Sequence, residues 1–154
     1  MPQTAKTIEI DASPSAVWEI LTRFEGYAEW NPYYRWAIGV AEKGAGLRLY
    51  ATPAGLRPFT FRPRVVFIRP EREMRWTGPI RPFGLLHGEQ TFRLEPIGSE
   101  QTRLTQEMRL RGPLFRFGGK DLVSRIGEGM EAMNRAMRVA LEGGIGAGHA
   151  GGET

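Results

Sequence analysis

The most regular hydrophobic pattern in the chain lies near its C-terminus. Between Gly119 and Leu141, apolar residues recur at spacings of three and four, which is the period of an amphipathic helix. Two glycines, at positions 143 and 144, follow this segment and are typical helix terminators. The pattern predicts one long helix whose buried face carries Leu122, Ile126, Met130, Met133, Met137 and Leu141.

Shorter runs upstream alternate between apolar and polar residues, as half-buried strands do. They cover residues 7–11, 33–40, 47–51, 59–68, 73–77, 86–94 and 102–110. Short turns rich in glycine, proline and charged residues separate the later runs, and no helical segment intervenes. Successive strands joined in this way predict an antiparallel meander.

Two short helices are expected after the first strand. Ser13 is a good N-cap, and Pro14 then occupies the first helical position, where its missing N–H costs nothing. A second helical segment, 24–30, should end at Asn31, because a residue that precedes proline is disfavoured in the helical region.

These elements predict an α+β fold, in which a curved antiparallel sheet of about seven strands wraps round the long C-terminal helix. A sheet must cover its apolar face, and this helix is the only predicted element long enough to do so. Residues 1–142 form the single predicted domain, and the glycine-rich tail 143–154 is expected to be disordered. The presumed inner face is rich in aromatic residues: Trp36, Phe59, Phe61, Trp76 and Phe92. A gap between such a sheet and its helix is a place where small apolar ligands bind.

Composition narrows the chemistry. The chain of 154 residues has no cysteine, so disulfides and thiolate sites are excluded. Its two histidines and two aspartates offer too few ligands for a metal centre, and we expect neither metal nor cofactor. No apolar run approaches the roughly 20 residues that cross a bilayer, and no signal peptide is recognised, so a cytoplasmic protein without membrane insertion is expected. The net charge of +4 comes from dispersed arginines rather than a cluster, which does not favour specific nucleic-acid binding.

The sequence resembles the SRPBCC superfamily, which includes START-like lipid carriers, Bet v 1-like proteins and polyketide cyclase/dehydrase relatives. The similarity covers residues 7–142 and is carried by the opening strand and helix start at 8–18, the block 24–32 that ends Trp-Asn-Pro, and the strand blocks 76–78, 88–96, 102–107 and 112–114. The resemblance implies a helix-grip fold with a ligand cavity. Many relatives have a histidine where this chain has Gln90, and the glycine-rich loop of the Bet v 1-like branch is reduced to 44–46.

The predicted ligand-binding residues are those expected to face inward. Gln90 and Gln106 alternate with apolar residues, so their amides should bond each other or a ligand. Segments 79–84 and 113–117 are candidate lids. The full set is Trp36, Phe59, Phe61, Trp76, Gln90, Phe92, Gln106, Met108, Phe115, Ile126, Met130 and Asn134.

No catalytic residue is assigned. His87 should lie at a strand end on the face opposite Gln90, where it is either an exposed histidine or a base at the cavity mouth. Glu89 and Glu107 should be surface partners of Arg93, Arg103 or Arg109.

Three functions follow as hypotheses. The first is a binding module that takes up a small hydrophobic or aromatic molecule, lipid or polyketide-like, for transport, sensing or sequestration. The alternative is a cyclase or dehydratase acting on a polyketide-like substrate in the same cavity. The third is a protein or nucleic-acid partner that uses the arginine-rich convex face. The sequence leaves open whether any reaction is catalysed and whether the chain forms a homodimer.

Overall fold

A computed structural model describes residues 3–81, 86–113 and 119–143. A strand comes first, then three short helical segments, seven strands and a long helix. In chain order the elements are β1 (Gln3–Ile10), α1 (Pro14–Thr22), η1 (Phe24–Gly26), α2 (Tyr27–Trp30), β2 (Tyr34–Ile38), β3 (Arg48–Ala51), β4 (Phe59–Phe61), β5 (Arg64–Arg69), β6 (Glu73–Arg81), β7 (His87–Gly98), β8 (Gln101–Arg111), α3 (Gly119–Arg138) and the π-helical turn η3 (Val139–Gly143).

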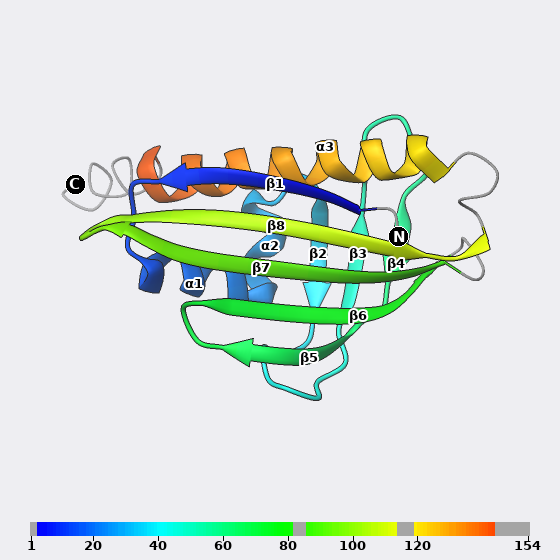
Figure 1. Ribbon diagram of the computed structural model, residues 1–154, viewed down its shortest axis with the longest axis horizontal. Helices are drawn as coiled ribbons and strands as arrows, with labels where there is room; N and C mark the ends of the chain where they lie inside the picture. The colour runs from blue at the N-terminus through cyan, green and yellow to red at the C-terminus, as the bar shows by residue number, and fades with distance from the viewer. Residues whose placement is uncertain (1–2, 82–85, 114–118, 144–154) are drawn as a thin grey trace.

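The strands form one antiparallel sheet in the order β1-β8-β7-β6-β4-β3-β2, with β5 paired to β6 off this path. The sheet curls round α3, as Figure 1 shows: α3 runs along β1 and β8, and β2, β3 and β4 cross behind it at a steep angle. This is the helix-grip arrangement that the sequence predicted.

The helix starts agree with the capping signals. Ser13 caps α1, since its hydroxyl accepts a hydrogen bond from the Ala16 N–H at 3.2 Å, and Pro14 opens the helix. The segment 24–30 is η1 followed by α2, and it ends at Asn31 as expected. The apolar residues at the predicted spacing on α3 and η3 are all buried.

Two predictions need correction, one of a strand and one of a lid. The run 59–68 is not one strand, because buried Pro63 separates β4 from β5, and a proline has no N–H to contribute to the ladder. The candidate lid 79–84 begins as strand, since residues through Arg81 belong to β6 and pair with β4 and β7. The rest of that segment, nearly all of the lid proposed at 113–117, and the tail beyond Gly143 lie outside the described residues.

Among the described helices, none is both long enough and apolar enough to cross a bilayer.

Candidate functional site

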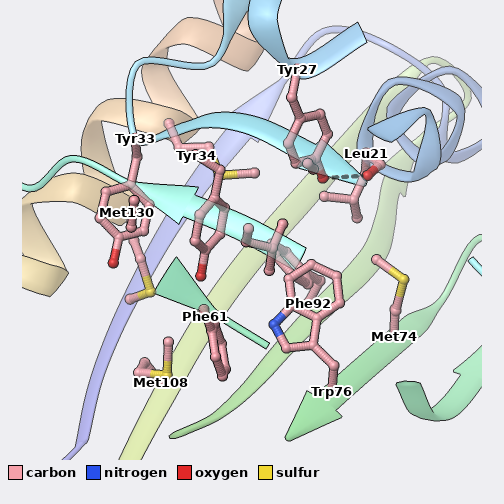
Figure 2. Packing of buried hydrophobic residues seen from close by; sticks show 14 of the residues in the cluster. Leu21, Tyr27, Tyr33, Tyr34, Phe61, Met74, Trp76, Phe92, Met108 and Met130 are labelled. Carbon is pink, nitrogen blue, oxygen red and sulfur yellow. Dashed lines mark hydrogen bonds between the residues drawn. The ribbon is translucent and has the colours of Figure 1, made fainter. Parts of the chain in front are cut away.

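Aromatic side chains fill the interior between the sheet and α3. Trp76 of β6 lies at the centre, with ring centroids 5.0 Å from Phe92, 5.9 Å from Phe24 and 6.4 Å from Tyr34. All four side chains are buried, and Met108 and Met130 extend the same wall (Figure 2). The interior therefore presents polarisable, adaptable surface to anything it encloses.

Two adjacent tyrosines enter this interior through a local turn. The side-chain oxygen of Asn31 accepts hydrogen bonds from the backbone N–H groups of Tyr33 and Tyr34, both at 2.9 Å. This Asx-type turn reverses the chain after α2 and lets two consecutive side chains point inward, which regular strand geometry forbids. Gly129 of α3 makes room for Tyr33, because a Cβ atom there would lie 2.2 Å from the tyrosine ring.

A chain of hydrogen bonds crosses the interior from sheet to helix. The Tyr34 hydroxyl donates to Gln90, whose amide nitrogen donates to Gln106 at 2.9 Å. The Gln106 amide nitrogen in turn donates to Asn134 on α3 at 2.7 Å, and Asn134 donates to the Lys6 carbonyl at 3.3 Å. These buried amides satisfy one another, as buried polar groups in a stable core must.

Among the described residues, three buried donors have no such partner: the side-chain amide nitrogen of Asn31, in the turn before β2, and two groups among the interior rings. Within the described part of the chain, neither the indole N–H of Trp76 nor the hydroxyl of Tyr33 makes a hydrogen bond. Figure 2 shows both directed into the same interior region as the Tyr34 hydroxyl. A buried donor without an acceptor is costly, so these two groups are suited to donate to an acceptor atom on an enclosed molecule.

The interior tyrosines are neutral donors. Burial raises the pKa of Tyr27 and of Tyr33 well above the usual value. Burial also raises the pKa of Tyr34, and the neighbouring Tyr33 and Tyr27 raise it further. Each phenol therefore keeps its proton throughout the physiological range and can donate a hydrogen bond.

Most of the sequence-predicted site residues come together in this interior. Gln90 and Gln106 face inward and bond each other, as predicted. Phe59 lies edge-on to Tyr33, with centroids 6.5 Å apart. The predicted residues that are buried in the interior are Phe59, Phe61, Trp76, Gln90, Phe92, Gln106, Met108, Ile126, Met130 and Asn134.

Trp36 does not join them, and Phe115 lies outside the described residues. A register shift between Tyr34 and Trp36 turns the tryptophan to the opposite face, where it stacks on Tyr50 at 5.4 Å with nearly parallel rings. Tyr50 lies between inward-facing Leu49 and Ala51, so it too faces away from the interior. The expectation that Trp36 faces inward is therefore wrong, because a bulge breaks the alternation on which it depended.

His87 lies outside the interior. It is the first residue of β7 and bonds the Thr77 hydroxyl at 3.0 Å on the outer face, opposite Gln90 as expected. Burial lowers the pKa of His87, Arg111 lowers it further, and Glu89 raises it.

Glu107 pairs with Arg93 at 3.3 Å, which confirms its surface role.

Sequence reasoning missed Phe24, Tyr27, Tyr33 and Tyr34 as interior residues. Phe24 and Tyr27 fall in helical segments, and Tyr33 and Tyr34 lie where the Asn31 turn enters β2, so strict alternation could not place both tyrosines on the inner face. The one available signal was Asn31 before Pro32, which predicts a turn that redirects the following residues.

A groove of about 500 Å³ lies apart from this interior, between α1, α2 and η3. Its walls include Ile20, Trp30 and Leu141, with Arg23 and Glu29 at its edge. Of the predicted ligand-binding residues that the structure describes, none lines it.

The long helix held in a curled antiparallel sheet defines the SRPBCC, or START-like, class of proteins. Residues 1–142 match the family described as "Polyketide cyclase / dehydrase and lipid transport", and the chain belongs to that family. No match is found among curated proteins.

Solved structures share the fold at low sequence identity. A START superfamily protein from Mycobacterium smegmatis is 22% identical, with 91% of this chain and 97% of that chain covered and a TM-score of 0.73. DynU16, from the dynemicin biosynthetic locus, is 20% identical (92% and 48% covered, TM-score 0.71). The di-domain ARO/CYC StfQ from the steffimycin biosynthetic pathway is 15% identical (90% and 45% covered, TM-score 0.69). At these identities the similarity establishes the fold alone.

Proposed function

We propose that this protein binds a small hydrophobic or aromatic molecule, lipid or polyketide-like, between the sheet and α3, for transport, sensing or sequestration. The observation that carries the proposal is the pair of unpartnered donors, the Trp76 indole N–H and the Tyr33 hydroxyl, in an interior otherwise built of aromatic rings and methionines.

This arrangement selects a particular kind of ligand. The apolar wall favours a molecule with a flat or flexible hydrocarbon body, because burial of that surface supplies the binding free energy. The two donors favour a carbonyl or ether oxygen on that body, since an acceptor there satisfies groups that are otherwise unpaired. A polyketide-like ketone and a lipid ester both meet these requirements.

The direct test is native mass spectrometry of the purified protein, followed by extraction and identification of what is bound. The proposal expects a co-purifying apolar molecule that carries an oxygen acceptor. Trp76→Phe should reduce its occupancy, whereas Trp36→Phe should not, because Trp36 stacks on Tyr50 outside the interior. Equal occupancy in the wild type and both variants would place the molecule elsewhere and contradict the proposal.

A cyclase or dehydratase that acts on a polyketide-like substrate is the second candidate. It is favoured by the buried Tyr34–Gln90 pair, which offers a protonated phenol held by an amide. The one phenolic proton is donated to Gln90, so to act as an acid on a substrate carbonyl Tyr34 would exchange that bond for the carbonyl oxygen. Two structures with the same fold come from biosynthetic systems, although the similarity itself is to the fold only.

Turnover distinguishes the two candidates. If the protein is an enzyme, Tyr34→Phe or Gln90→Ala should abolish conversion of a polyketide-like substrate. His87→Ala should retain it, because His87 lies on the outer face. If the wild-type protein binds the substrate without converting it, the result would support the binding function and contradict the enzymatic one.

A further inference from the structure

A second depression, of about 540 Å³, lies on the outer face of the sheet. Three arginines line it, Arg48, Arg62 and Arg64, together with Thr77 and His87. Ile38, whose side chain is exposed, forms part of an apolar edge. Among the described residues, none of the interior residues named above lines the depression.

Backbone pairing fixes the three arginines around this depression. The Leu47 N–H donates to the Pro63 carbonyl at 2.8 Å, which places Arg48 beside the β4–β5 connection. The Arg62 N–H donates to the Pro79 carbonyl at 3.1 Å, and Arg64 pairs with Thr77 across β5 and β6. Gly78 permits this close approach, because a Cβ atom there would lie 2.5 Å from the Arg62 carbonyl oxygen. Backbone hydrogen bonds and strand pairing therefore fix the positions from which the three arginine side chains extend.

Three other arginines of the same sheet pair with carboxylates. Arg75 pairs with Glu73, Arg93 with Glu107, and Arg103 with both Glu9 and Glu95. Within the described residues, by contrast, no carboxylate pairs with Arg48, Arg62 or Arg64, and Arg64 donates only to the Gly44 carbonyl, at 2.5 Å. Like charges held near one another without counter-charges are destabilising, and an anion relieves that repulsion.

We propose that this depression binds a phosphomonoester. A guanidinium presents parallel N–H donors that match the oxygens of a phosphate group, and three of them supply enough charge for a dianion. The Thr77 hydroxyl adds a neutral donor beside them. The apolar edge at Ile38 suits the organic group that the phosphate carries, which a bare inorganic anion lacks. A soluble phosphate ester and a phosphatidate headgroup share this chemistry.

His87 gives a direct readout of occupancy. It is one of two histidines in the sequence, and it lines the depression, so its NMR signals report a bound phosphate. A bound dianion should also raise the pKa of His87, because negative charge favours the imidazolium form.

The test titrates the full chain with phenyl phosphate, and separately with phosphatidylcholine vesicles prepared with and without phosphatidate. The proposal expects a saturable shift of the His87 ring signals with phenyl phosphate, or phosphatidate-dependent sedimentation with vesicles. The first result identifies a soluble ester, and the second identifies a lipid headgroup.

Arg62→Gln/Arg64→Gln should weaken whichever binding is seen about tenfold or more, because two charge-assisted contacts are lost. Arg93→Gln/Arg103→Gln is the matched control, since it removes the same charge from the same sheet at paired positions. All four side chains lie at the surface, so both variants should keep the wild-type melting temperature. Equal weakening in the two variants, or no response to either probe, would overturn the proposal.

Discussion

The amide of Gln106, on β8, donates a 2.7 Å hydrogen bond to the Asn134 side chain on α3. This contact lies inside the protein and joins the sheet to the helix that it encloses. It also completes the chain of polar groups that begins at Tyr34, so the geometry of the interior depends on it.

Replacement of Gln106 by leucine should lower the free energy of unfolding by about 1–3 kcal/mol, because Gln90 and Asn134 each lose a buried partner. Asn134→Leu in the same background should cost much less than it costs in the wild type. A double-mutant cycle in urea measures this difference. Additive effects of the two substitutions would mean that the bond contributes nothing to the packing of α3.

Tyr33 and Tyr27 offer a matched comparison of hydroxyl groups. The Tyr27 hydroxyl donates to the Leu21 carbonyl at 2.5 Å, whereas the Tyr33 hydroxyl has no partner in the described structure. In ligand-free protein, Tyr27→Phe should therefore cost about 1–2 kcal/mol, and Tyr33→Phe about zero. Denaturant unfolding checks both values, and equal costs would show that the Tyr33 hydroxyl is already satisfied.

The packing of α3 against the sheet depends on Ile126, which is fully buried. Ile126→Asp should lower the free energy of unfolding by about 3 kcal/mol or more, because it buries an unpaired carboxylate. Ser124→Asp, at an exposed position of the same helix, is the control and should change it by less than about 0.5 kcal/mol. A small effect at Ile126 would mean that α3 is not packed against the sheet as described.

The pH dependence of His87 follows from its surroundings. Burial first, and then Arg111, lowers its pKa in the folded protein, so the unfolded chain binds the proton more readily. The contribution of His87 to stability is therefore complete above the unfolded value of about 6.5 and is lost as the pH falls through the lowered folded value.

Arg111→Gln should raise the pKa of His87 in an NMR titration, because one of the two causes of the lowering is removed. Arg135→Gln, which removes a charge that pairs with Glu131 on α3, should leave it unchanged. A wild-type pKa at or above about 6.5 would contradict this picture.

The fold could be predicted wherever one local pattern decided the structure. Ser13 and Pro14 fixed the start of α1, and the three–four spacing from Leu122 to Leu141 fixed the buried face of α3. The prediction failed where a single residue broke a pattern. Pro63 divides β4 from β5, and the bulge after Tyr34 turns Trp36 outward.

The site was less accessible to prediction than the fold. Gln90 and Gln106 stood out because polar residues at apolar positions of an alternating strand must find partners. Tyr33 and Tyr34 did not, because their orientation depends on the Asn31 turn and on the space that Gly129 leaves. The outer arginines looked like an ordinary solvated face, and only strand register shows that Arg48 lies beside the connection that carries Arg62 and Arg64.

We expect an apolar molecule in the interior to accept a hydrogen bond from Trp76. The four tryptophans make it testable, because Trp36 lies on the outer face and Trp30 lines the groove beside α1. The measurement is the indole N–H spectrum of the ¹⁵N-labelled protein during titration with 1-tetralone, a bicyclic aromatic ketone, and with a long-chain fatty acid ester. We predict a saturable shift of the Trp76 signal, with the Trp36 signal unchanged. An unchanged Trp76 signal with both probes, or shifts confined to Trp30, would contradict it.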